Sequence, residues 1–219
     1  MCWSAKSSLT AYIVGTIASV ALLWYGNSVD KNIGLFFLAV VQMQLIEFFI
    51  WRDQKCGRVN NLASRMIVPD LTFQVVAMVM GAYVFKSTIL SDAAMYYLMS
   101  FVLAFAASTI GFYFYRISNQ VLCSAKLRNQ GIQWDVGSHN VIDNLDPVSM
   151  VWKLVYYGAL FGFPLLWKSD LKKYLFVISG LVSWLWIRHD NKHTWKSRWC
   201  FPSALVPTFY VLLMILRIK

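Results

Sequence analysis

Hydrophobic residues along this chain of 219 residues occur in long runs that are separated by short polar stretches. Most runs are roughly 17–23 residues long, the length at which an α-helix crosses the apolar core of a bilayer. A helix satisfies its own backbone hydrogen bonds in lipid, and the alternating segments of about ten residues that a β-barrel requires are absent from the sequence. The pattern therefore predicts an all-α polytopic bundle of transmembrane helices.

Seven spans are predicted, and together they form a single integral membrane domain over residues 1–219. They cover residues 9–25, 33–51, 67–85, 93–115, 151–167, 175–187 and 201–216. The third span is expected to begin with Pro69 in its first turn, where a missing N–H costs little. The fifth span is expected to break near Pro164, because proline removes a helical hydrogen bond.

The number of spans places the two termini on opposite sides of the membrane; we call the side of the N-terminus side A and the other side B. Thirteen of the 20 Lys and Arg residues then belong to side A and seven to side B. Cytosolic loops are enriched in Lys and Arg. The charge bias therefore predicts a cytosolic N-terminus and a C-terminus on the opposite side. The first run is not followed by a cleavage site, so it is predicted to remain as a span.

One connection is much longer than the others and covers about residues 116–150 on side A. It has no repeat and no low complexity, and it contains the apolar residues Ile132, Trp134, Val136 and Val141. Loops of this length are usually functional or disordered. Because this loop has side chains that can pack, we expect it to form a folded cap over side A.

Composition changes the expected partners. The chain is 58% hydrophobic and 14% charged, whereas soluble domains average about 25% charged residues. The formal net charge of +10 would favour nucleic acid in a soluble protein. In a membrane protein it predicts contact with the anionic headgroups of the bilayer. The sequence has no nucleic-acid-binding motif, so no nucleic acid partner is expected, and an oligomer is compatible with the sequence.

All cysteines and histidines fall on side A. Reduced thiols are expected there if side A is cytosolic, whereas two disulfides would be the simpler account if it faced outward. The spacing of His189 and His193 resembles half of a zinc site, so Zn²⁺ is the candidate cofactor. A basic, tryptophan-containing loop at the membrane interface explains the same stretch. The residues concerned are Cys2, Cys56, Cys123, Cys200, His139, His189 and His193.

Carboxylates inside predicted spans are costly and indicate function by default. Gln44, Glu47 and Trp51 share one face of the second span, and Asp70 and Gln74 share one face of the third. A short loop joins these spans, so the two faces are predicted to meet in a polar pocket below side A. The competing interpretation is that the carboxylates pair with Arg52 and Arg65, or that Asp70 serves a helix N-terminus.

Three short motifs resemble a family of small polytopic membrane proteins found in bacteria, giant DNA viruses and protists. Its members open with M-C-[FW]-S, carry Q-x-x-E-x-x-x-W in an early span and have S-x-W-C near the C-terminus. The resemblance implies a set of positions and no reaction. The matching residues are Cys2, Trp3, Ser4, Gln44, Glu47, Trp51, Ser197, Trp199 and Cys200.

The leading hypothesis is a membrane protein with a pocket at its cytosolic face that acts on or binds a lipid-like substrate. Glu47, Cys2 and Cys200 would carry the chemistry, and Gln44, Trp51, Asp70 and Gln74 would contact the substrate. A metal would be held by His139, His189 and His193. The architecture is also similar to that of the alkaline ceramidase and progestin/adiponectin-receptor zinc hydrolases, but their Ser/His/Asp placements are not matched.

The competing class is non-enzymatic. A structural or scaffolding protein, for example of a viral envelope, or a small transporter or channel would use Glu47 and Gln44 to join helices by hydrogen bonds. No Gly-rich phosphate loop and no G-x-S-x-G elbow occurs in the sequence, which excludes the enzymes built on those motifs.

Overall fold

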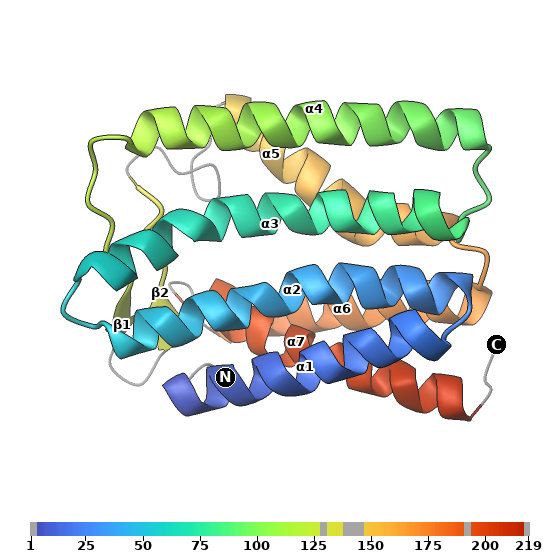
Figure 1. The fold of residues 1–219 in the computed structure, drawn as a ribbon, viewed down its shortest axis with the longest axis horizontal. Coiled ribbons are helices and arrows are strands. Elements are labelled where there is room, and N and C mark those ends of the chain that lie inside the picture. Colours follow the sequence, from blue (N-terminus) through green and yellow to red (C-terminus); the bar gives the residue numbers. More distant parts are fainter. Residues whose placement is uncertain (1–3, 128–130, 138–146, 191–193, 217–219) are drawn as a thin grey trace.

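A bundle of long helices makes up the computed structural model, which describes residues 4–127, 131–137, 147–190 and 194–216. Successive long helices run in opposite directions, so α1 begins at one end of the bundle and the last helix finishes at the other (Figure 1). The helices are α1 (Ala5–Tyr25), α2 (Ser28–Arg52), α3 (Arg58–Phe85), α4 (Asp92–Ile117), α5 (Pro147–Tyr157), α6 (Asp170–Asp190) and α7 (Trp195–Ile215). The all-α prediction is confirmed for the described residues.

Six helical segments are long and apolar enough to cross a membrane. They are α1, α2, α3, α4, a segment from Ser149 to Leu166 that starts within α5, and α7. Helix α6 contains the sixth predicted span, residues 175–187, but it is not among these six. Charged residues occupy both of its ends, with Asp170, Lys172 and Lys173 at one and Arg188 and Asp190 at the other. The length and apolar composition of these six segments fit membrane spans, and the count of seven spans stays a prediction.

Local sequence determines where the first two helices begin. Ser4 accepts a hydrogen bond from the backbone of Ser7, and Ser7 returns one to Ser4. Asn27 and Asp30 form the same reciprocal arrangement at the start of α2. Both are capping boxes, in which side chains satisfy the backbone N–H groups that a helix start leaves without partners.

The centre of the bundle is α2, which packs against α1, α3 and α7. Small residues allow close approach on the α1 side. A Cβ atom on Gly15 would lie 2.3 Å from the carbonyl oxygen of Ala204 in α7 and 2.5 Å from a methyl carbon of Val41 in α2. Glycine is therefore required here by backbone contact, in the manner typical of membrane helix interfaces. Helix α4 packs on α3 and leaves most of its surface exposed.

Helix α3 begins earlier than its hydrophobic run predicts. It starts at Arg58, so Pro69 lies inside the helix and the prediction of a first-turn proline is wrong. The polar first turns of α3 fold as helix because Asn60 and Ser64 are buried under the long loop. Asp70 consequently lies several turns into the helix, which also removes the interpretation that it serves the N-terminus of α3.

The fifth predicted span breaks as expected near Pro164. Helix α5 continues as a π-helical turn (Gly158–Gly162) and a 3₁₀ turn (Phe163–Leu166). The sequence pattern gave no sign of two short strands in the long loop, β1 (Ala125–Leu127) and β2 (Gly131–Gln133), which pair antiparallel. They lie at the side A end of the bundle, beside the turn between α2 and α3 (Figure 1).

Candidate functional site

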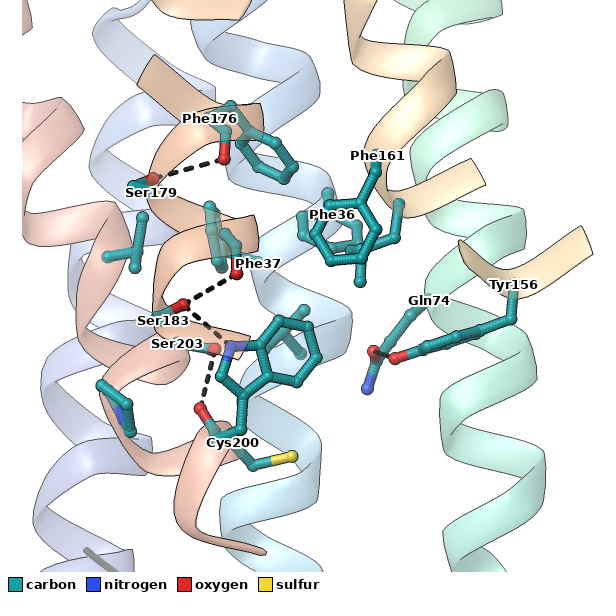
Figure 2. A pocket seen from close by; sticks show the side chains of 16 residues that line it. Phe36, Phe37, Gln74, Tyr156, Phe161, Phe176, Ser179, Ser183, Cys200 and Ser203 are labelled. Carbon is teal, nitrogen blue, oxygen red and sulfur yellow. Dashed lines mark hydrogen bonds between the residues drawn. The ribbon is translucent and has the colours of Figure 1, made fainter. Parts of the chain in front are cut away.

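A cavity of about 200 Å³ lies inside the bundle between α2, α3, α6, α7 and the segment that contains α5 and the π-helical turn. Figure 2 shows Phe36, Phe161 and Phe176 at one end of the cavity and Cys200, Gln74 and Tyr156 at the other. Because α6 begins at side B and α7 begins at side A, the aromatic end is nearer side B and the polar end nearer side A. The site therefore has a polar and an apolar pole.

The polar pole contains a chain of hydrogen bonds that starts in α3. The Tyr156 hydroxyl donates to Gln74 Oε1 at 3.1 Å, and Gln74 Nε2 donates to Asp70 Oδ2 at 3.0 Å. The predicted shared face of Asp70 and Gln74 is thus formed, and Gln74 lines the cavity. Of the predicted partners, Arg65 instead donates to the backbone oxygen of Gln120 at 2.6 Å.

Cys200 lies on α7 at the same pole. Its side chain is buried and is not part of a disulfide. It lines both the main cavity and a second cavity of about 30 Å³ that is also lined by Trp134 and Lys196. The small cavity therefore connects the surroundings of Cys200 with the long loop on side A.

Serine residues of α6 and α7 form one wall of the main cavity (Figure 2). Each hydroxyl donates to the backbone of its own helix: Ser179 to Phe176, Ser183 to Gly180 and Ser203 to Trp199. A hydroxyl oxygen has two acceptor lone pairs. The wall therefore offers oxygen acceptors, of which Ser183 already uses one for the Trp199 indole N–H at 2.9 Å.

Glu47 is fully buried in α2 near side A, but it is not among the residues that line the main cavity. Trp134 of the long loop donates its indole N–H to Glu47 Oε1 at 3.0 Å, and Gln44 Nε2 lies 3.4 Å from Oε2. The predicted face of Gln44 and Glu47 is present. Its partner is the loop, through Trp134.

Trp51, the third member of that face, contacts the loop as well. The Lys126 ammonium lies 5.7 Å from the centre of the Trp51 ring. The Trp51 indole N–H has no hydrogen-bond acceptor among the described residues. Trp51 therefore contacts strand β1 through Lys126, and it does not line the main cavity.

The long loop is bound tightly to the first turns of α3. The Ser124 backbone N–H donates to Asn60 Oδ1 at 3.0 Å, and Asn60 returns a hydrogen bond to the Ser124 oxygen at 2.8 Å. Ser64 and Asp135 also bond to Ser124. These contacts hold Trp134 in place above Glu47. Residues 138–146 of the predicted cap lie outside the described residues.

The turn between α2 and α3 is held by Asp53. Its carboxylate accepts hydrogen bonds from the backbone N–H groups of Gly57 and Asn60 at 3.1 and 3.0 Å. These bonds favour the ionised form, so they hold the pKa of the Asp53 carboxyl below its usual value. This turn precedes the helix to which the loop is bound.

A disulfide joins the same turn to the loop. Cys56 is bonded to Cys123, and their Cα atoms are 5.1 Å apart. The expectation of reduced thiols on a cytosolic side A did not anticipate this bond, which belongs to the outward-facing alternative. Cys2 lies outside the described residues, so the predicted proximity of Cys2 and Cys200 stays a prediction.

The side chains of the predicted metal ligands lie outside the part of the chain that the structure describes. His139 and His193 are not described, and His189 is placed only as part of the α6 backbone. Among the residues that the structure does describe, no group of three or more His, Cys, Asp and Glu side chains is arranged to hold a metal. The zinc hypothesis thus has no geometric support from the described part of the chain.

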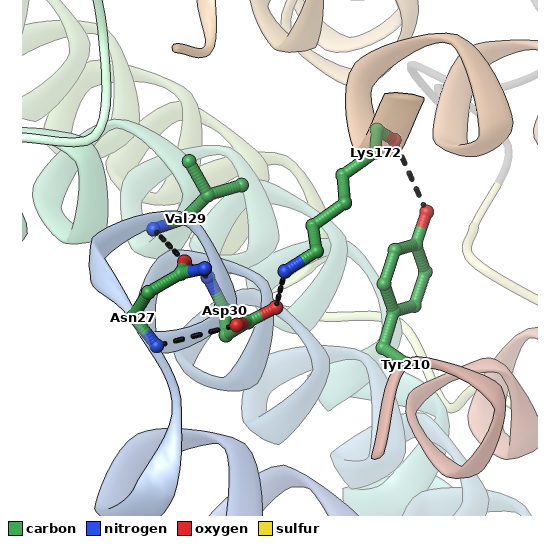
Figure 3. A network of polar contacts seen from close by, with 5 residues as sticks. All are labelled: Asn27, Val29, Asp30, Lys172 and Tyr210. Atoms are coloured by element: carbon green, nitrogen blue, oxygen red, sulfur yellow. Dashed lines mark hydrogen bonds and ion pairs between the residues drawn. The ribbon is translucent and has the colours of Figure 1, made fainter. Parts of the chain in front are cut away.

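A buried ion pair at the side B end was missed by the sequence reasoning. Lys172 Nζ lies 2.7 Å from Asp30 Oδ1, and each side chain is only 2% exposed. Figure 3 shows Asp30 between Asn27 and Lys172, with the Tyr210 hydroxyl pointing to the Lys172 backbone oxygen at 3.3 Å. The sequence placed Lys172 in a side B loop. The only signal in the sequence was that Lys172 stands four residues before Phe176, so the two share a helix face once α6 begins at Asp170.

The fold and cavity define a class: a helical bundle with helices of bilayer length and a mostly apolar cavity between the helices. Comparisons of the chain with protein-family models, with curated proteins and with solved structures gave no match. The family resemblance carried by the three short motifs stays a prediction.

Proposed function

We propose that this chain is an integral membrane protein that binds an apolar, lipid-like molecule in the cavity between α2, α3, α6 and α7. The observation that carries the proposal is the cavity itself, which is about 200 Å³ in volume and is lined mainly by aromatic and aliphatic side chains. Ligand sites are typically concave and apolar with a few placed polar groups. Cys200, Gln74 and Tyr156 supply those groups at one pole.

The residues that the sequence predicted to carry the chemistry or to contact the substrate have new roles in this proposal. Cys200 and Gln74 contact the ligand, because they line the cavity. Glu47 and Gln44 hold the loop through Trp134, a role that matches the hydrogen-bonding function considered in the non-enzymatic alternative. Binding is therefore the function that the geometry supports best, and no reaction is assigned to it.

Filling the cavity is expected to abolish binding. Ser179 lines the cavity, and Ser179→Leu would place a larger apolar side chain in the space that the ligand needs. The measurement is photolabelling in lipid nanodiscs by an octane-length alkyl diazirine, read by mass spectrometry on α7 peptides. Saturable labelling of wild-type α7 is expected to fall at least fivefold in Ser179→Leu, as roughly 1 kcal/mol of lost affinity requires.

The chain offers a matched control. Ser100 on α4 also donates its hydroxyl to the backbone of its own helix, to the oxygen of Tyr96 at 2.9 Å, but its side chain is exposed. Ser100→Leu is expected to leave the labelling of α7 unchanged. Equal labelling of α7 in wild type and Ser179→Leu would show that the probe does not occupy the cavity, and the binding proposal would then be wrong.

We also propose that the N-terminus lies in the cytosol, on the strength of the positive charges of side A. The Cys56–Cys123 disulfide stands against this orientation, because structural disulfides are rare in reducing compartments. An N-terminal epitope tag in intact cells distinguishes a cytosolic N-terminus from an external one. Protection of the tag from external protease is expected; digestion of the tag would reverse the orientation and place the disulfide outside.

A further inference from the structure

The charge of the cavity wall limits the ligands it can accept. None of the sixteen residues that line the cavity is Lys, Arg, Asp or Glu. A charged group of either sign buried there would lose its hydration without gaining a counter-ion from the wall, and burial of an unpaired charge costs several kcal/mol or more. The Asp70 carboxylate accepts from the lining residue Gln74 but does not itself line the cavity. The ion pair of Asp30 with Lys172 is already formed, with both side chains buried. The wall is therefore suited to a neutral ligand.

The serine wall adds a second requirement. The hydroxyl protons of Ser179, Ser183 and Ser203 are all used by backbone oxygens of their own helices. What these residues present to the cavity is oxygen lone pairs, which are hydrogen-bond acceptors. A ligand group that forms a hydrogen bond with these oxygens must donate, as a hydroxyl does. An ether or ester oxygen can only accept.

The volume adds a third requirement. An engineered cavity of about 150 Å³ binds benzene, and this cavity is moderately larger, at about 200 Å³. It accepts one ring or one short chain and cannot enclose a lipid with two acyl chains. The rings of Phe36 and Phe176, whose centres are 5.6 Å apart, form the apolar pole against which such a chain would pack.

From these three features we infer that the ligand is a small, neutral alcohol, with its hydroxyl donated to the serine wall and its single chain or ring among the phenylalanines of the apolar pole. This inference rests on the proposed function, since it names the chemical class of the molecule that occupies the same cavity. It narrows the lipid-like substrate expected from the sequence to a molecule without a charged headgroup.

Competition against the alkyl diazirine probe tests the inference. Octanol, octane and octanoate have chains of equal length and differ in the polar group. At equal concentration in the bilayer, octanol is expected to displace the probe from α7 roughly three- to tenfold more effectively than octane, as one net hydrogen bond requires. Octanoate is expected to displace it less effectively than octane, because its charge would be buried without a partner.

All three hydroxyls of the serine wall are then removed. In the triple variant Ser179→Ala, Ser183→Ala, Ser203→Ala, the advantage of octanol over octane is expected to disappear, while octane still displaces the probe because the lining becomes more apolar. The double variant Ser179→Ala, Ser203→Ala keeps Ser183, the acceptor of the Trp199 indole N–H, and is expected to lose most of the advantage. The variant Ser100→Ala, on the exposed face of α4, should leave the advantage of octanol unchanged. Alanine fits wherever serine does, so these variants are expected to fold, and probe labelling itself reports that the cavity is intact.

The possible outcomes separate the inference from the proposed function. If wild-type α7 shows no saturable labelling, the proposed function is wrong and the inference falls with it. If labelling is saturable but octane or octanoate competes as well as octanol, the cavity binds apolar molecules and the assignment to a neutral alcohol is wrong. Retention of the octanol advantage in the triple serine variant would also overturn it.

Discussion

Replacing Lys172 by Met is expected to lower the free energy of unfolding by about 3–5 kcal/mol, because the change leaves the Asp30 carboxylate buried without its cation. The loss is expected to be large because neither side chain is accessible to solvent, and water cannot enter to stabilise the remaining charge. Asp30→Asn is expected to destabilise the protein in the same way by leaving the Lys172 ammonium, while its side-chain oxygen can still accept from Asn27.

A double-mutant cycle separates this pair from other effects. Asp30→Asn combined with Lys172→Met removes both charges, so the double variant is expected to lose less stability than the sum of the single variants, with a coupling of about 0.5–3 kcal/mol. The measurement is reversible unfolding in mixed micelles. Lys86→Met is the control: Lys86 pairs with Asp92, but those side chains are 54% and 77% exposed, and such pairs contribute about 0–1 kcal/mol. Purely additive losses in the cycle would contradict the ion pair.

The second large effect is expected at Trp134, where the loop contacts the bundle. Trp134→Ala should lower the free energy of unfolding by about 3–5 kcal/mol, since it removes a buried aromatic side chain and the donor to Glu47 together. Trp134→Phe keeps most of the apolar surface and removes the N–H, so a smaller loss of about 1–3 kcal/mol is expected. Unfolding in micelles and the rate of proteolysis within residues 118–137 are the measurements.

Trp24 supplies the control for this prediction. It lies near the end of α1 and is 77% exposed, so Trp24→Ala is expected to change stability in micelles by less than about 0.5 kcal/mol. If Trp134→Ala changes the free energy of unfolding as little as Trp24→Ala does and leaves the proteolysis rate unchanged, the loop is not held by Trp134. The role of the Trp134–Glu47 hydrogen bond in fixing the loop would then be wrong.

The helices could be predicted from the sequence because an apolar run of bilayer length predicts a helix without reference to the rest of the chain. Contacts within one helix followed from spacing alone, as for Gln44 with Glu47 and Asp70 with Gln74. The polar beginning of α3 could not be predicted, since Asn60 is helical and buried only because Ser124, distant in sequence, bonds to it. Pro69 was misplaced for the same reason.

The elements that give the site its character are nonlocal. Nothing in the spacing of Asp30 and Lys172 indicates that they meet across the bundle. In the same way, Trp134 was predicted to pack in the cap, but its bond to Glu47 depends on how the loop folds back. Cys56 was one of four candidates for pairing, and its bond to Cys123 follows from the fold of the same loop. The cavity itself lies where five segments leave space between their side chains, and no pattern within one segment can predict such a space.

Mapping where the octane-length diazirine reacts in the wild-type protein tests the central claim most directly. Labelling should be compared between α7 residues 200–206, which include the cavity-lining Cys200 and Val206, and α4 residues 96–101, whose Tyr97 and Phe101 are exposed. We expect the α7 label to saturate with probe concentration and the α4 label to rise in proportion to it, as contact with bulk lipid requires. Label on α7 that rises in proportion to probe, just as on α4, would contradict an occupied cavity.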